Sequence, residues 1–243
     1  MSSSTGPDAL GFQRTRWSLV LAAGKTADPA ARAALSELCA AYWMPLYHYV
    51  RRRGHDRASA EDLVQGFFAR FLERDDVGAA DATRGRFRAF LLTALKHHLA
   101  DEHDLRTAEK RGGGRAPLSL DFERADSEWR LEPATDATPE KAYERAFAEE
   151  LLARALGRVE HDYAERGEAR AFGVLVQTLT APGALPYRAL AHELGTSEGA
   201  VQVAAHRLRE RWRAALRDEV ASLVDDPADV DEELASLFAA LGG

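Results

Sequence analysis

The stretch PYRALAHELGTSEGAVQVAAHRLRERWRAAL, residues 186–216, predicts two helices joined by a short turn. The first helix opens at Pro186, since proline is tolerated at a first helical position. Gly195 ends it, because glycine adopts the positive φ that a helix end often requires. Thr196 or Ser197 then caps the second helix by accepting a hydrogen bond from an unpaired backbone N–H group. This pattern is that of a helix-turn-helix, although an ordinary pair of packed helices fits the spacing equally well.

The second helix separates an apolar stripe from a polar and cationic face. Its apolar positions recur at helical spacing from Val201 to Leu216. Side chains off that stripe suit base edges and phosphates, and those in the first half of such a helix can enter a major groove. We therefore expect the DNA-facing residues to be Ser197, Glu198, Gln202, His206, Arg207 and Arg209.

The composition bounds the class of protein. A chain of 243 residues holds one or two domains, and abundant periodic apolar segments with few strand signals predict an all-α fold. The net charge of −7 excludes a protein that coats nucleic acid by charge alone, but arginine clusters allow local contacts. The single cysteine, Cys39, lies on an apolar stripe and predicts a buried thiol in a reducing compartment. No run is long enough to span a membrane, so we expect a cytoplasmic protein with no membrane partner.

Breaks in the helical pattern predict two small helical domains joined by an acidic linker. Three glycines interrupt the pattern at 112–114, Thr138 with Pro139 signals a new helix start, and Asp226 with Pro227 signals another. The expected divisions are a disordered N-terminus (1–11), a first helical domain (12–111), a linker (112–137), a helix-turn-helix domain (138–224) and a helical tail (225–243).

The first domain contains two helices with distinct signatures. The helix over 30–53 holds Pro45, which predicts a kink because proline removes a helical hydrogen bond. The helix over 59–73 is expected to start at Ser59, with Asp62 completing the cap. Its core row is flanked by Val64, Phe68 and Leu72, more apolar surface than one helix usually buries. An exposed edge for a partner fits this excess, and so does a helix sandwiched between two others.

A long helix over 84–110 combines an apolar stripe with an exposed cationic side. Cations beside aromatic rings are what melted nucleic acid requires, because charge follows the backbone and rings stack on bases. The expected contacts to DNA are Arg84, Arg86, Arg88, Lys96, His97, Arg106, Lys110 and Arg111.

The segment KHHLADEHD, residues 96–104, also suggests a metal site. His97 with Asp101, and His98 with Glu102, stand four residues apart on a helix. The two pairs point about 100° apart, however, and no matching cluster occurs elsewhere in the sequence. We therefore expect no metal ion and no other cofactor.

The motifs in their order resemble the extracytoplasmic-function (ECF) sigma factors of bacterial RNA polymerase. The resemblance rests on WMPLYHYV (43–50), AEDLVQGFFARFL (60–72), GRFRAFLLTALKHHLADEHD (85–104), KRGGG (110–114), TPEKAYERAF (138–147) and the helix-turn-helix reading LGTSEGAVQVAAHRLRERWRAALRDEVA (194–221). The chain is most similar to the subgroup with a TRWSLVLAA N-terminus (15–23) and a DPADVDEELASLFAAL tail (226–241).

The resemblance implies a non-enzymatic initiation factor whose first domain is region-2-like and whose second carries the promoter-reading helix. It implies binding of core RNA polymerase through Asp62, Leu63, Gln65, Phe68 and Leu72. It further implies recognition and opening of the minus-10 element by residues 81–111, a linker that runs toward the active-site cleft, and recognition of the minus-35 element by the helix from Ser197. The partners are then core polymerase, double-stranded promoter DNA and its melted strand.

The sequence departs from the family at two places. Gly66 stands where an acidic residue is common, and residues 197–203 carry no cation, so the promoter sequence stays undetermined. Regulation by an anti-sigma factor, a regulatory kinase or the C-terminal tail also stays open.

Two other classes of protein compete with this interpretation. A stand-alone helix-turn-helix repressor would use the N-terminal half to dimerise or to bind an effector. A metal-dependent hydrolase would use His97, His98, Asp101 and His103. Neither accounts for an aromatic and basic helix followed by an acidic linker.

Overall fold

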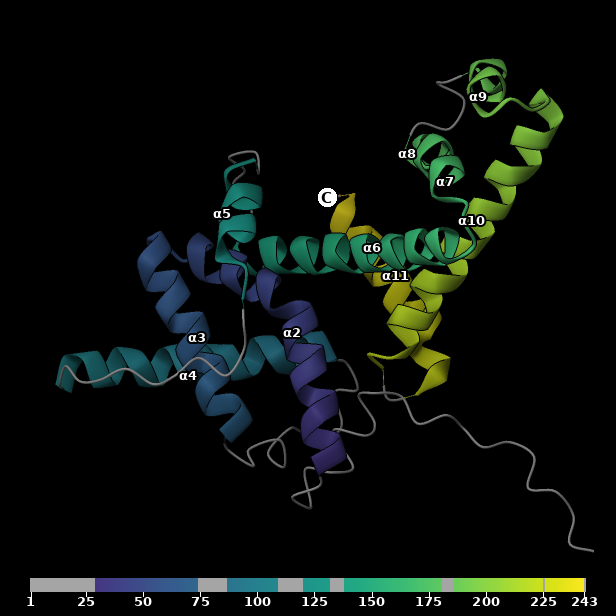
Figure 1. Ribbon diagram of the computed structural model, residues 1–243. Coiled ribbons are helices and arrows are strands. Elements are labelled where there is room, and N and C mark those ends of the chain that lie inside the picture. The colour runs from purple at the N-terminus through teal and green to yellow at the C-terminus, as the bar shows by residue number, and fades with distance from the viewer. Residues whose placement is uncertain are drawn as a thin grey trace, which may run out of the picture.

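A computed structural model describes residues 29–73, 87–108, 120–131, 138–180, 186–224 and 226–242. These ranges form helices and no β-strand, which confirms the all-α prediction (Figure 1). The helices are α2 (Pro29–Arg52), α3 (Arg57–Glu73), α4 (Phe87–Ala108), α5 (Phe122–Leu131), α6 (Pro139–Glu165), α7 (Ala169–Leu175), α8 (Gln177–Thr180), α9 (Tyr187–Leu194), α10 (Glu198–Ala221), the 3₁₀ helix η3 (Pro227–Asp229) and α11 (Val230–Leu241). The expected disordered start (1–11) and the apolar segment after it lie outside the described residues.

The kink predicted in α2 is present. Tyr42 interrupts the helix with φ −123° and ψ 25°, three residues before Pro45. Pro45 has no N–H to donate to the carbonyl four residues earlier, and its ring crowds that carbonyl. The bend turns the Tyr42 ring toward α6, where it stacks on Phe147 at 4.9 Å between ring centroids.

The helix α6 connects the two halves of the chain. It packs on α2 at its start and on α10 toward its end, so it runs across the middle of the molecule (Figure 1). The Tyr143 hydroxyl donates to the Arg88 carbonyl of α4 at 2.8 Å, and Tyr42 meets Phe87 edge-on at 6.0 Å. Buried side chains from both halves therefore form one continuous core. The predicted division into a domain over 12–111 and another over 138–224 stays a prediction.

Two predicted helix starts are confirmed and one is corrected. The Thr138 side chain accepts the Lys141 N–H at 3.3 Å, and Asp226 accepts the Ala228 N–H at 2.8 Å. The cap of α3, in contrast, is Asp56, three residues before the expected Ser59, because Asp56 accepts the Ser59 N–H at 2.8 Å. Aspartate and serine cap equally well, so the pattern alone did not choose between them.

The expected acidic linker contains a helix, α5, that the sequence analysis did not predict. Phe122 packs against Trp43 and Tyr47 of α2, at centroid distances of 4.9 and 5.6 Å. Asp126 is buried, accepts the Tyr47 hydroxyl at 3.0 Å and is ion-paired with Arg51. The linker helix α5 therefore docks on α2 of the same chain.

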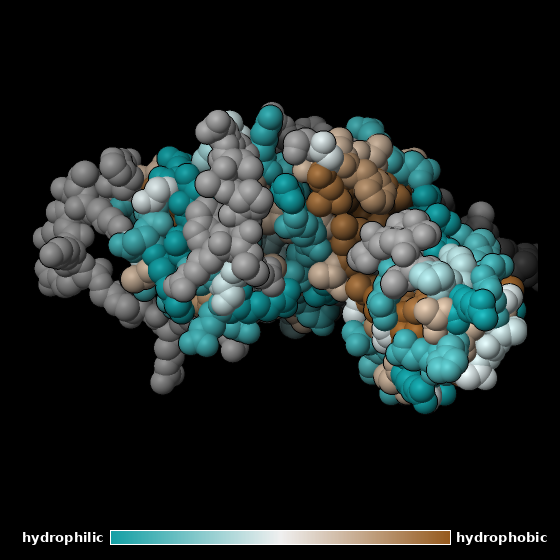
Figure 2. Space-filling view, turned by 90° about the horizontal axis from the view of Figure 1, so that it is seen from above, coloured by the Kyte–Doolittle hydropathy of each residue, from teal (hydrophilic) through white to brown (hydrophobic). Residues whose placement is uncertain are grey.

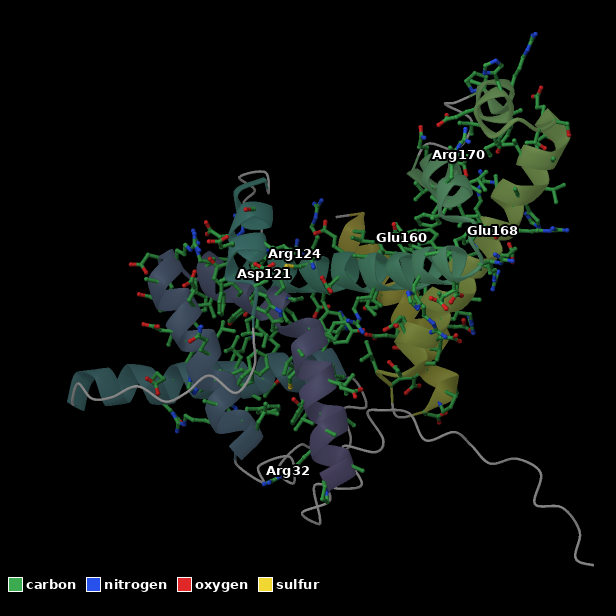
Figure 3. All side chains as sticks on the ribbon, in the orientation of Figure 1. Arg32, Asp121, Arg124, Glu160, Glu168 and Arg170 are labelled. Atoms are coloured by element: carbon green, nitrogen blue, oxygen red, sulfur yellow. The ribbon has the colours of Figure 1, made fainter. Side chains whose placement is uncertain are left out.

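The second half ends in a small bundle around α10. The segment 169–180 forms two short helices, α7 and α8, which are divided at Val176. Arg170 on α7 extends toward α9, where it donates to the Glu193 carbonyl at 2.8 Å (Figure 3). This end of the molecule lies far from α3 and α4 (Figure 1). Within the described ranges, no helix combines the length and apolarity that a membrane span requires.

Candidate functional site

The helices α3 and α4 carry the residues expected to bind polymerase and the minus-10 element. They are joined by aromatic contacts, with Phe71 of α3 lying 5.6 Å from Phe90 of α4 between ring centroids. Arg70 of α3 also pairs with Asp101 at 3.6 Å and with Glu102 at 3.2 Å. These contacts fix the faces that the two helices present outward.

The expected apolar edge of α3 is not exposed. Phe68 and Val64 have no accessible surface and Leu63 is buried, because α3 packs against both α2 and α4. The sandwiched arrangement is therefore the correct alternative for these side chains. Of the expected polymerase contacts, Asp62 is exposed, and Gln65 and Leu72 are half-buried. The face that a partner can reach is thus mainly polar.

His98 is part of the packing between α3 and α4. Its ring lies 5.8 Å from the Phe67 ring and next to Gly66, where a side chain's Cβ would stand 3.8 Å from the imidazole. Burial lowers the pKa of His98, and the nearby carboxylate of Glu102 opposes that shift. An imidazole enclosed in this way is a packing group, while its neighbour His97 is exposed.

The structure gives no support to the metal alternative. Glu102 pairs with Arg70 instead of facing a ligand site with His98. Among the residues that the structure describes, no three His, Cys, Asp or Glu side chains come together as a metal site would require. The side chain of His103 lies outside the description. Cys39 is fully buried, as predicted, and burial raises the pKa of its thiol.

Arg88, expected to face DNA, is buried instead. Only 7% of its surface is exposed, and its guanidinium is ion-paired with Glu144 of α6 and Glu233 of α11. The prediction of an exposed Arg88 is therefore wrong for this arrangement of the chain. The sequence analysis predicted a separate C-terminal tail, and nothing in the pattern of the tail indicated that Glu233 would reach Arg88.

The other expected minus-10 residues fall into two groups. Lys96 is half-buried, pairs with Glu140 of α6 at 2.8 Å and lies 5.8 Å from the Tyr49 ring centroid. The hydrogen bond from Lys96 lowers the pKa of Glu140. His97 is exposed on α4. The structure does not describe the side chains of Arg84, Arg86, Arg106, Lys110 and Arg111.

The turn between α9 and α10 has the predicted geometry. Gly195 adopts φ +65°, the left-handed conformation that favours glycine, and ends α9. Ser197 accepts the Ala200 N–H at 3.2 Å and so caps α10. The first turns of α10 project from the bundle because the residues that pack it, beginning with Val201 and Ala205, lie on one side only.

The outer face of α10 holds most of the expected minus-35 residues. Glu198, Gln202, His206 and Arg207 are all exposed there. Arg209 is the exception, since it donates to the Thr178 carbonyl and to the Tyr187 hydroxyl, both at 3.2 Å. Arg209 therefore joins α8, α9 and α10, and the prediction that it faces DNA is wrong in this structure.

Val203 is a candidate that the sequence analysis missed. It is 51% exposed and lies on the same face as Gln202 and His206. Phe238 of α11, at 53%, is the other large apolar side chain exposed to this degree within the described ranges. The signal was present in the sequence, because Val203 stands outside the stripe that begins with Val201.

Comparison with known proteins identifies one part of the chain. Residues 39–109 match the family model of sigma-70 region 2. The match covers α3, α4 and most of α2. No curated protein and no solved structure matches the chain. The region 2 match supports a sigma factor of the sigma-70 family, a class that associates with RNA polymerase, recognises promoters and in general has no enzymatic activity.

Proposed function

We propose that the chain is a sigma factor of the ECF type that directs core RNA polymerase to promoters, in the cytoplasm where polymerase and DNA meet. The observation that carries the proposal is the region 2 match on residues 39–109, which contains both α3 and α4. The exposed face of α10 supports it from the other half of the chain. Its task is to bind and position, and it needs no cofactor.

Core polymerase binds the polar outer face of α3. Asp62 and Gln65 stand on that face, while Leu72 lies at its edge. Because Leu63 and Phe68 hold α3 in the core, they act by positioning the helix, not by touching the partner. A polar contact of this kind orients a partner and fixes its register.

The minus-35 element binds α10. Gln202 can donate and accept at one base edge, as glutamine does with adenine, and Arg207 can pair with a phosphate. Val203 adds an apolar contact suited to the methyl group of thymine. With few cations and a net charge of −7, the free chain binds DNA weakly, and polymerase gains specificity by holding both halves on one promoter.

The test is transcription from genomic DNA by purified core polymerase, with and without the protein. We expect defined transcripts that appear only when the protein is added. Gln65→Ala with Asp62→Ala should weaken polymerase binding, whereas Glu149→Ala, an exposed acidic residue of α6, is the control that should not. Unchanged polymerase affinity in the double variant would remove the assignment of α3.

A second set of variants tests α10 on a library of promoter fragments. Gln202→Ala should change which base is preferred, by about 1–3 kcal/mol for a bidentate contact. Arg207→Ala should weaken all sequences alike and reduce the salt dependence. Arg213→Ala, an exposed residue in the second half of the same helix, is the matched control. Tight and specific binding by the protein without polymerase would instead favour the stand-alone repressor.

A further inference from the structure

The side chain of Arg88, at the start of α4, is enclosed by the C-terminal half of the chain. Its Nε donates to the Glu233 carboxylate at 2.6 Å, and its Nη2 donates to the Ser236 hydroxyl at 2.8 Å. Glu144 of α6 supplies the second carboxylate. Glu233 is only 3% exposed, so α11 covers the guanidinium with a buried acidic group.

The backbone at the start of α4 is also closed by the C-terminal half. The first N–H groups of a helix have no partner within the helix. The Phe87 N–H donates to the Leu223 carbonyl at 3.1 Å, two residues after α10 ends. One of the groups that a helix start would offer to an anion is therefore occupied by the chain itself.

We propose that α11 is an autoinhibitory latch, in which Glu233 holds the guanidinium of Arg88 until the phosphate backbone of melted promoter DNA replaces it. A phosphate and a carboxylate bind the same N–H groups of an arginine, so the two compete for Arg88. The proposal rests on the proposed function, in which α4 contacts the opened strand. It adds that this contact requires α11 to leave α4 first.

The latch is small enough to open. Of the apolar side chains of α11, Val230 and Leu237 are buried, whereas Leu234 and Leu241 are half-buried and Phe238 is 53% exposed. Figure 2 shows an apolar area on the upper face of the molecule, where Figure 1 places the end of α11 beside α6. A helix of 12 residues is marginal without tertiary contacts, so it can separate and unfold without the rest of the core.

The test measures binding of a labelled single-stranded DNA to the free chain by fluorescence anisotropy. Glu233→Gln keeps the shape of the side chain, removes its charge and should tighten binding about fivefold or more, the lower range of typical intramolecular coupling. Glu149→Gln is the matched control, because it removes one charge from an exposed carboxylate of α6 that pairs with Arg145 of the same helix instead of with Arg88. Its affinity should stay near that of the unmodified chain.

The released group is identified by a double variant. Arg88→Gln combined with Glu233→Gln should lose the gain, because no guanidinium is then set free. Equal affinity of Glu233→Gln and Glu149→Gln would overturn the latch, and so would a gain that persists without Arg88. Circular dichroism shows whether each variant retains its helices.

Hydrogen exchange on the unmodified chain tests the latch without any substitution. The amides of α11 should be protected in the free protein and should exchange faster in a complex with core polymerase and promoter DNA. Undiminished protection in that complex would contradict the proposal. Failure of the proposed function is seen separately, as an absence of protein-dependent transcripts, while the oligonucleotide assay still measures the latch.

Discussion

Replacing Phe68 by alanine should destabilise the packing of α3 against α2 and α4 and not merely remove a contact with a partner. Phe68 has no exposed surface, and its ring lies 5.0 Å from that of Phe67. A fully buried phenylalanine cut back to alanine loses its transfer free energy and leaves a cavity, together about 3–5 kcal/mol. A domain is stable by about 5–15 kcal/mol, so this loss is a large part of the total.

The assay is urea unfolding followed by circular dichroism, with polymerase binding measured on the same samples. Phe68→Ala should lower the free energy of unfolding by about 3–5 kcal/mol. Gln65→Ala, one turn away on the half-buried side of α3, should stay within about 0.5 kcal/mol of the unmodified chain. Loss of polymerase affinity by Phe68→Ala at unchanged stability would refute this reasoning and restore Phe68 as an exposed contact.

Three further predictions concern the backbone, pH and DNA. Gly157→Ala should stabilise the protein by about 0.5–1 kcal/mol, because a Cβ inside α6 meets nothing within 4 Å, whereas Gly195→Ala should destabilise it by about 1–2 kcal/mol at φ +65°, both measured by urea unfolding. The lowered pKa of His98 means that the unfolded chain binds the proton more readily, so the free energy of unfolding should fall as pH drops below about 6.5. The fall should be smaller in His98→Gln, and thermal unfolding across pH measures both. Replacing the thymine that contacts Val203 by uracil should weaken holoenzyme binding about fourfold, and Val203→Ala should abolish the difference between the two bases in a competition assay.

Local signals predicted the helix ends well. Gly195 needs a positive φ, and Ser197 and Thr138 have side chains that reach the backbone within their own turn. Such features depend on neighbours within about four residues, so the sequence displays both partners. The kink at Tyr42 is of the same kind, because Pro45 causes it directly.

Contacts between distant segments were not predictable in the same way. Arg88 and Glu233 are 145 positions apart, and each has the spacing of an ordinary surface charge on its own helix. Arg209 was likewise predicted to contact DNA, because the sequence does not show that its two acceptors lie on α8 and α9. Burial of Phe68 had the same cause, since a helix pattern does not say how many neighbours will cover it.

The two carboxylates around Arg88 belong to helices that differ in how much of their surface packs against the rest of the chain. Glu144 stands on α6, whose neighbours Tyr143 and Phe147 are buried against α2 and α4. Glu233 stands on α11, which is held by two buried apolar side chains, Val230 and Leu237, and by the half-buried Leu234 and Leu241. Departure of α11 therefore removes Glu233 while Glu144 stays.

A phosphodiester that then binds Arg88 restores one negative charge beside the remaining carboxylate. The guanidinium faces two negative charges before and after the exchange, and the Glu144 carboxylate stays beside it throughout. A broken buried ion pair is costly because it leaves a buried charge without a partner, and that does not happen here. Opening α11 thus suffices for Arg88 to meet the strand, and the larger apolar contact between α2 and α6 need not separate for that step. If α2 and α6 do separate, the cause is a different one: the distance at which polymerase holds α3 and α10 on one promoter.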